Sequence, residues 1–358
     1  PPCPLPDGRL ARKPLGREII SVWLGFEMPA PAARSTGASR ILAMLGDRPA
    51  RIAVFGAGAV GGYFGGRLAE AGQDVTFIAR GAHLDAIQRH GLHVASTKGD
   101  FVVDPATATN DTSSVGVVDV VLVAVKAGVV SDVAPSLRPM LGSHTVVIPL
   151  QNGVEAASHL MAALGSESVI GGLCRIVASV TSPGRITHTG IEPTVIVGEL
   201  SGSTSERVGL VRDLLTEAGV AVEVADDIQA ALWDKFLLIA PWGGLGGLTR
   251  VTLDVLCGTP ETRRLLTQAM SEVAAVAAAH GVTLAPDIVE RTMRFLGQVP
   301  AGGTASMQRD IMERRPSELD AQIGAIVRLG REKRVDTPIN TFVYECLLAG
   351  ERIARGEA

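Results

Sequence analysis

Residues 51–81 read RIAVFGAGAVGGYFGGRLAEAGQDVTFIARG, and the architecture of the first half of the chain follows from this stretch. Its first five residues form a short apolar run that predicts a buried strand. A glycine-rich turn and a helical stretch to residue 71 follow, and Gly72 predicts the end of that helix. Residues 74–79 predict a second strand, so the order is that of a βαβ unit, which builds a parallel sheet.

The turn carries the pattern GxGxxG at Gly56, Ala57, Gly58, Ala59, Val60 and Gly61. The first glycine permits the tight turn, the second lets the backbone approach a pyrophosphate, and the third lets the helix pack on the strand. The start of the helix presents unpaired N–H groups to phosphates. A glycine turn without a ligand is the alternative, but the position between strand and helix predicts a dinucleotide-binding site.

The residue at the end of the second strand distinguishes NAD from NADP. An acidic residue there would bind the ribose 2′-hydroxyl, whereas this chain has Arg80. A guanidinium binds a 2′-phosphate through paired, charge-assisted hydrogen bonds. We therefore predict NADPH/NADP+ as the cofactor, the alternative being that Arg80 is only a solvated residue at a strand end.

Further apolar runs at residues 119–125 and 145–149 predict more strands of the same sheet. Lys126 ends the first of these runs, and Gln151 and Asn152 follow the second. Because ligands of open α/β sheets bind beyond the carboxyl ends of the strands, we expect these residues to line the nicotinamide half of the cofactor site.

The fold class is α/β, with an N-terminal Rossmann domain of mostly parallel sheet over residues 50–225 and an all-helical domain over residues 226–358. Residues 195–198 and 220–224 are expected to finish the first domain. Asp226 or Asp227 can cap the first helix of the second, and residues 261–280, 317–331 and 339–355 predict further helices. Residues 1–49 are rich in Pro, Arg, Ala and Gly and predict a disordered or non-native extension, or alternatively a targeting or regulatory arm.

Composition narrows the class of partner. The net charge is −4 and no basic block stands out, which argues against nucleic acid. No apolar run approaches the ~20 residues of a membrane span. The four cysteines lie far apart without a CxxC pair, so we expect no metal site and a reducing, cytoplasmic location. The sequence leaves open whether the chain forms a homodimer.

The same stretch 51–81 resembles the N-terminus of the ketopantoate reductases (2-dehydropantoate 2-reductases). The likeness extends over nearly everything after residue 50, and its motifs are VLVAVKA, PLQNGVE, GRITHTG, WDKF, SMQRDIMERRPSELD and TPINTFVYECL. Their combination and order are far more specific than the glycine pattern. The resemblance implies an active site in a cleft between the two domains, hydride transfer from NADPH to the ketone of a 2-oxo acid, and a place in pantothenate biosynthesis.

The resemblance also implies roles for single residues. Lys235 of WDKF corresponds to the proton donor, and Glu318 of SELD contacts substrate and cofactor. Ser306 helps to bind the substrate, together with Asn152. On the cofactor side the resemblance assigns Arg80 to the 2′-phosphate, Lys126, Asn152 and Glu318 to cofactor contacts, and Ala178 to a backbone contact.

The chemistry is consistent with these roles. Hydride addition to a ketone leaves a developing alkoxide, which a nearby ammonium stabilises and protonates. Lys235 lies in an apolar segment, so burial should lower its pKa, although Asp234 could oppose this. The alternative is a surface lysine whose stem packs on its helix. Ser317 and Asp320 resemble a capping box, which predicts the start of a helix at this point. Glu318 would lie in the first turn of that helix, where a carboxylate is expected to stay ionised. The alternative is that Glu318 only helps the helix to begin.

The chain departs from the family where the substrate is bound. Family members usually have asparagines four and eight residues after the lysine, where this chain has Ile239 and Gly243. They often have a third asparagine three residues before the serine, where this chain has Gly303. Residues 241–247 (PWGGLGG) also predict a break in the helix. We expect a less polar and roomier pocket, lined by Trp242.

Three hypotheses remain open. The chain reduces a different, more apolar 2-oxo acid or ketone, or it is a ketopantoate reductase with rearranged substrate contacts, or it is a catalytically weak NADP(H)-binding sensor or regulatory protein. Retention of Lys235, Glu318 and Ser306 argues against the third, since a sensor would need the glycine turn but not the proton donor.

Overall fold

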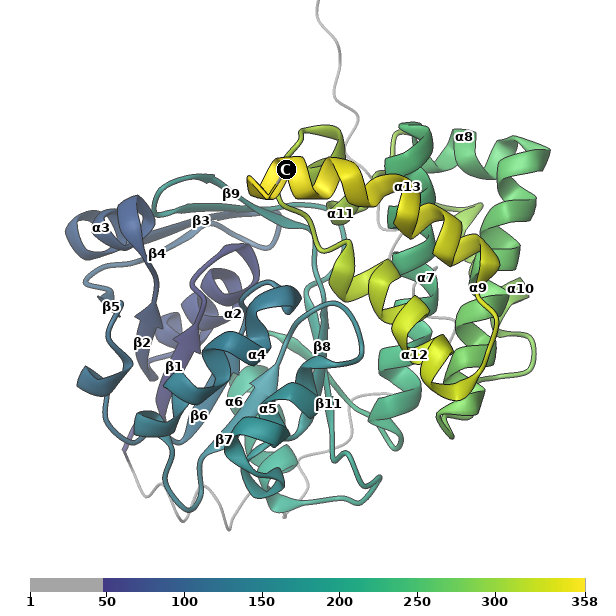
Figure 1. Cartoon of the computed structure of the whole chain (residues 1–358). Helices are drawn as coiled ribbons and strands as arrows, with labels where there is room; N and C mark the ends of the chain where they lie inside the picture. The colour runs from purple at the N-terminus through teal and green to yellow at the C-terminus, as the bar shows by residue number, and fades with distance from the viewer. Residues whose placement is uncertain (1–47, 358) are drawn as a thin grey trace, which may run out of the picture.

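The strands of the first lobe are buried on both faces, as their uninterrupted apolar sequences predict. In β1 (Arg51–Phe55), Ile52 and Val54 pack into one core, and Ala53 and Phe55 pack into another. The computed structural model describes residues 48–357 and shows two lobes, one carrying the sheets and one made of helices (Figure 1). The prediction for residues 1–49 lies outside the described residues, apart from Arg48 and Pro49.

The central sheet has the order β5-β2-β1-β6-β7, and every neighbouring pair is parallel. Its other strands are β2 (Asp74–Ile78), β5 (Thr107–Thr109), β6 (Val120–Val123) and β7 (Val146–Pro149). The helices of this lobe are α2 (Ala59–Glu70), α3 (Gly81–His90), α4 (Val130–Val133), α5 (Ala156–Leu164) and α6 (Glu206–Glu217). The parallel sheet predicted from the βαβ pattern is confirmed. The strand order reverses between β1 and β6, since β2 lies on one side of β1 and β6 on the other, and such sheets bind ligands at this point.

Two smaller sheets complete the lobe. The first has the order β4-β3-β10-β9 and the second β12-β11-β8. Their strands are β3 (Leu92–Ser96), β4 (Phe101–Val103), β8 (Gly171–Arg175), β9 (Ala178–Ser182), β10 (Arg185–His188), β11 (Thr194–Gly198) and β12 (Ala221–Val224). The two strands predicted at the end of this lobe therefore form, but they do not extend the central sheet: β11 pairs with β8 on one side and with β12 on the other.

The second lobe is helical and surrounds its own core. Its first helix, α7 (Ile228–Thr249), begins at Asp227, whose side chain accepts a hydrogen bond from the backbone N–H of Ala230 at 3.0 Å. The others are α8 (Leu253–Gly258), α9 (Pro260–Ala279), α10 (Ile288–Leu296), α11 (Ser306–Met312), α12 (Ala325–Lys333) and α13 (Pro338–Arg355). Within residues 48–357, no helix is both long and apolar enough to cross a membrane.

The predicted break at residues 241–247 is wrong, because α7 continues through Pro241. The glycines allow other segments to approach the helix closely. A Cβ atom at Gly244 would lie 2.8 Å from Ile323, and one at Gly246 would lie 2.5 Å from Gln308. Packing thus outweighs the low helix propensity of glycine and proline here.

The helix predicted over residues 317–331 starts later and differently. A π-helical turn, Asp320–Gly324, precedes α12. Ser317 and Asp320 do not form the expected capping box: the Ser317 hydroxyl bonds Glu351, and the Asp320 carboxylate accepts hydrogen bonds from Arg328 and Tyr344. Residue 318 therefore lies in a bend just before a π turn, a feature that is frequent at functional sites.

Candidate active site

The glycine turn after β1 packs tightly against the segment that follows β6 and is open on its other side. Gly56 has φ +100°, and a Cβ atom there would lie 2.8 Å from the backbone nitrogen of Val125. A Cβ atom at Gly61 would lie 2.2 Å from the carbonyl oxygen of Gly56, whereas one at Gly58 would meet nothing within 4 Å. The turn therefore leaves space beside Gly58 and the start of α2, where the helix N–H groups lack partners in their own helix.

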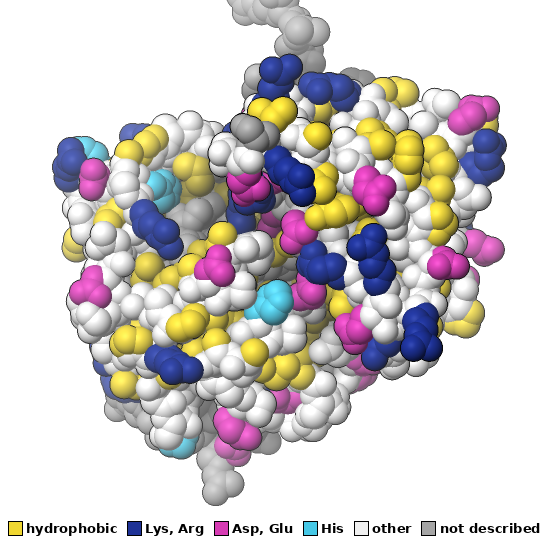
Figure 2. Space-filling model, in the orientation of Figure 1, with side chains coloured by type: hydrophobic (Ala, Val, Ile, Leu, Met, Phe, Trp, Pro, Cys, Tyr) yellow, Lys and Arg dark blue, Asp and Glu magenta, His cyan; other side chains and the backbone are white. Residues whose placement is uncertain are grey.

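A cleft of 2940 Å³ runs from this turn to the helical lobe. Charged side chains of both signs gather on the face where the two lobes meet (Figure 2). Of the residues predicted for the site, all but Gly61 line this cleft; Gly61 lies beneath the turn, where it serves packing. The lining members are Gly56, Ala57, Gly58, Ala59, Val60, Arg80, Lys126, Asn152, Ala178, Lys235, Ser306 and Glu318.

Arg80 and Ala178 lie on the wall formed by the first lobe. Arg80 follows β2 and is exposed at the start of α3, and Ala178 is the first residue of β9. The structure therefore leaves the guanidinium of Arg80 accessible from the cleft.

Lys235 comes from α7, and its Nζ donates a hydrogen bond to the backbone carbonyl oxygen of Cys174 on β8 at 2.6 Å. Burial lowers the pKa of Lys235, and the positive charge of Arg175 lowers it further, while Cys174 and the carboxylate of Glu318 act in the opposite direction. The lowered pKa follows the prediction from the apolar sequence around this lysine. For Asp234, burial raises the pKa of the carboxyl group.

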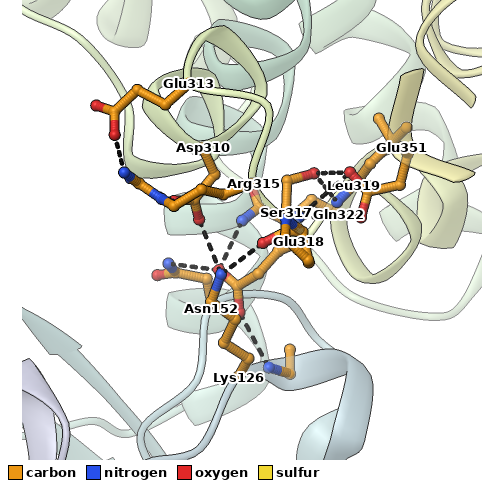
Figure 3. A network of polar contacts seen from close by, with 12 residues as sticks. Lys126, Asn152, Asp310, Glu313, Arg315, Ser317, Glu318, Leu319, Gln322 and Glu351 are labelled. Atoms are coloured by element: carbon orange, nitrogen blue, oxygen red, sulfur yellow. Dashed lines mark hydrogen bonds and ion pairs between the residues drawn. The ribbon is translucent and has the colours of Figure 1, made fainter. Parts of the chain in front are cut away.

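Glu318 reaches from the helical lobe to the ends of β6 and β7 (Figure 3). Its Oε1 accepts a hydrogen bond from the backbone N–H of Ala127 at 3.0 Å. Its Oε2 accepts hydrogen bonds from Asn152 at 3.5 Å and Gln322 at 3.2 Å. The carboxylate therefore accepts hydrogen bonds from three donors, two of which, Ala127 and Asn152, belong to the first lobe.

Lys126 also connects the two lobes. Its Nζ donates to Asp310 at 2.9 Å and to the carbonyl oxygen of Pro316 at 2.7 Å. Asp310 in turn accepts two hydrogen bonds from Arg315, at 2.8 and 3.0 Å. Our sequence reasoning missed Asp310, although it is the last residue of the SMQRD motif that we used for the resemblance.

His83 is a second residue that sequence reasoning missed. Its Nδ1 accepts a hydrogen bond from the backbone N–H of Gly184 at 3.1 Å, so the ring proton lies on Nε2, which donates to the carbonyl oxygen of Ala57 at 2.7 Å. The imidazole thus ties the glycine turn to the connection between β9 and β10. Only its position, one helical turn after Arg80, could have indicated this.

The region of the missing asparagines is apolar, and part of it is filled. Ile239 and Trp242 line the cleft, as expected for Trp242, together with Phe295 of α10 and with Val299. The expectation of a roomier pocket is wrong at Gly243, because a Cβ atom there would lie 2.8 Å from the Met307 side chain. Met307 therefore occupies the space that a larger residue at 243 would need.

Comparison with known proteins agrees with this architecture. The family described as "Ketopantoate reductase PanE/ApbA" matches residues 52–202, and its C-terminal counterpart matches residues 227–351. A 2-dehydropantoate 2-reductase of Mesorhizobium japonicum is 33% identical over 313 residues, which cover 82% of this chain and 94% of the relative.

Solved structures show the same fold. The crystal structure of a PanE/ApbA family ketopantoate reductase from Ralstonia eutropha JMP134 has a TM-score of 0.78 and 31% identity, covering 85% of this chain and 99% of the other. D-mandelate dehydrogenase, solved with NADH and anilino(oxo)acetate, has a TM-score of 0.77 and 23% identity, covering 85% and 99%. The chain therefore belongs to the ketopantoate reductase family of oxidoreductases.

Proposed function

We propose that the chain catalyses the NADPH-dependent reduction of a 2-oxo acid to the corresponding 2-hydroxy acid. The observation that carries this proposal is the position of Lys235: its ammonium, with a lowered pKa, lines the same cleft as the open glycine turn. A binding protein for NADPH would need the turn, but it would not need a half-buried proton donor in the same cleft.

The residues of the first lobe fit a phosphorylated dinucleotide. The backbone of residues 56–60 would hold the pyrophosphate, since a Cβ atom at Gly58 would fill the space beside it. Arg80 would bind the 2′-phosphate. Lys126 and Asn152 would hold the nicotinamide end, which supplies the hydride when the cofactor is bound, and the backbone of Ala178 would make a further contact with the cofactor.

Lys235 would supply the proton. The ketone carbon gains a hydride and its oxygen gains a proton, so the oxygen passes through a partial negative charge that the ammonium stabilises. The lowered pKa of Lys235 eases proton transfer near neutral pH. Glu318 would accept a hydrogen bond from the substrate hydroxyl and hold Asn152 in place, while Ser306 at the start of α11 would bind the substrate.

The substrate is the second part of the proposal. The Mesorhizobium relative is named for 2-dehydropantoate, which makes this 2-oxo acid the first candidate. The wall of Ile239, Trp242, Phe295 and Val299 favours a second candidate, a 2-oxo acid with a more apolar side chain. Loss of hydrogen-bonding groups from a pocket changes specificity by orders of magnitude.

The test follows NADPH absorbance with 2-dehydropantoate and a panel of 2-oxo acids that carry branched or aromatic side chains. We expect NADPH oxidation with at least one of them, and the ranking of kcat/KM decides between the two substrate candidates. If none of the 2-oxo acids consumes NADPH at a rate above the blank, the proposed function is wrong.

A further inference from the structure

The residue before Glu318 is held by the C-terminal helix. Ser317 is buried, and its backbone N–H donates to both carboxylate oxygens of Glu351, at 2.9 and 3.2 Å. Its hydroxyl donates to the same carboxylate at 2.6 Å, and its carbonyl oxygen accepts a hydrogen bond from Arg355 at 2.8 Å. Every polar group of Ser317 is therefore bonded to α13, and Figure 3 shows Glu351 beside Ser317 and Leu319.

Glu351 and Arg355 also bond each other. They are four residues apart on α13, with a nitrogen–oxygen distance of 2.7 Å and side-chain exposures of 6% and 35%. A buried carboxylate is costly unless it is paired and hydrogen-bonded. Here Ser317 and Arg355 supply that pairing, so the carboxylate and the segment it holds depend on each other.

The chain on the other side of Glu318 is also fixed. The backbone N–H of Gln322 donates to the carbonyl oxygen of Glu318 at 2.9 Å, and Leu319 is fully buried. The backbone N–H of Leu319 donates to the Ser317 hydroxyl at 3.1 Å, the same hydroxyl that bonds Glu351. The hydrogen bonds of α13 therefore reach Ser317 directly and Leu319 through the Ser317 hydroxyl.

We propose that Glu351 and Arg355, the α13 clamp, are positioning residues that hold the Glu318 carboxylate at the active site. This inference rests on the role of Glu318 in the proposed function. Neither clamp residue lines the cleft, and each acts through Ser317. Glu318 must face the N–H of Ala127 and the amide of Asn152 from across the cleft, and displacement of a catalytic group by about 1 Å can lower a rate ~100-fold.

The first experiment compares Glu351→Gln and Arg355→Met with Arg352→Met, a matched control on the exposed side of the same helix. We expect kcat for 2-oxo acid reduction to fall roughly 10- to 100-fold in Glu351→Gln and less in Arg355→Met, with Arg355→Lys partly restored and Arg352→Met unchanged. Arg355 is partly exposed, so its variants test the clamp even if a change at Glu351 prevents folding. Equal kcat in the clamp variants and in Arg352→Met overturns the inference.

The second experiment separates positioning from general stability by combining Glu351→Gln with Glu318→Gln. If the clamp acts through Glu318, the double variant has the same kcat as Glu318→Gln alone. If Glu351→Gln lowers kcat by the same factor in the Glu318→Gln background as in the wild-type background, the two residues act independently and the clamp is overturned. A Glu318→Gln variant with unchanged kcat would instead refute the role of Glu318 itself, and the clamp with it.

The pH profile gives a readout that a purely structural role would not change. The groups that act on the pKa of Lys235 are Cys174 and Arg175 from β8 of the first lobe and Glu318 from the helical lobe, and Glu318 raises this pKa. Displacing Glu318 should therefore move the alkaline limb of the kcat profile to lower pH in Glu351→Gln, as in Glu318→Gln. If the alkaline limb shifts in Glu318→Gln but not in Glu351→Gln, the α13 clamp is contradicted while the proposed role of Glu318 stands.

Discussion

The side-chain nitrogen of Lys235 lies 2.6 Å from the backbone carbonyl oxygen of Cys174. This hydrogen bond joins α7 of the helical lobe to β8 of the first lobe, so the candidate proton donor is fixed from across the cleft. Because a carbonyl oxygen cannot take up a proton at neutral pH, the bond orients the ammonium without neutralising it.

The lowered pKa of Lys235 predicts a pH dependence with a definite sign. Reduction requires the protonated amine, so kcat should fall as the pH rises through the pKa of Lys235, below the ~10.4 of an unperturbed lysine. Since the carboxylate of Glu318 raises that pKa, Glu318→Gln should move the fall to still lower pH. Profiles of kcat from pH 6 to pH 10 measure both effects, and a shift to higher pH in Glu318→Gln would contradict this account.

Arg80 should determine the choice of cofactor. Replacing Arg80 by Gln removes a charged partner of the 2′-phosphate, and hydrogen bonds to charged groups contribute about 1.5–3 kcal/mol. We expect the Kd for NADPH to rise roughly 10- to 150-fold and the Kd for NADH to stay nearly constant. Arg89→Gln, on an exposed part of the same helix, is the control. Equal weakening of both cofactors by Arg80→Gln would refute the assignment.

Two glycines of the turn should respond differently to the same change. Gly58→Ala places its methyl group in open space at φ −69°, so the protein should fold normally, while NADPH binding weakens by about tenfold or more, or ~1.4 kcal/mol. Gly61→Ala brings a methyl group within 2.2 Å of a backbone oxygen and should destabilise the fold by about 1–3 kcal/mol. Thermal unfolding and NADPH titration of both variants test this contrast, which fails if Gly58→Ala binds NADPH normally.

The apolar wall of the cleft can be tested by restoring an asparagine of the family. Ile239→Asn adds an amide where the side chain lines the cleft, so kcat/KM for 2-dehydropantoate should rise relative to that for an apolar 2-oxo acid by up to ~10-fold. Gly243→Asn collides with Met307 and should instead lower the melting temperature. An unchanged ratio in a folded Ile239→Asn variant would show that this wall does not contact the substrate.

The sequence predicted those parts of the molecule that depend on local pattern. The parallel sheet and the glycine turn follow from apolar runs and glycine spacing, and capping preference predicted Asp226 or Asp227 as the N-cap, of which the structure shows Asp227. The family motifs predicted which distant side chains line one cleft, among them Asn152 and Glu318, whose side chains meet at 3.5 Å. Their chemical roles remain predictions.

The features that could not be predicted depend on contacts between distant segments. The continuity of α7 through Pro241 depends on the close approach of Gln308 and Ile323 to its glycines. The helix propensities of single residues do not include such contacts. The same holds for Ser317, for which a local capping partner was expected and which bonds a glutamate 34 positions later in the chain. His83 bonds backbone groups 26 and 101 positions away, which no spacing rule indicates.

In the proposed reaction, Lys235 gives the proton to a substrate that NADPH reduces in this cleft. The most direct measurement is kcat for 2-oxo acid reduction by Lys235→Ala, with the Kd for NADPH determined on the same preparation. We predict a fall in kcat of roughly 10²–10⁴-fold with an unchanged Kd, the usual contribution of positioned acid catalysis. Turnover by Lys235→Ala at the wild-type rate would contradict the account.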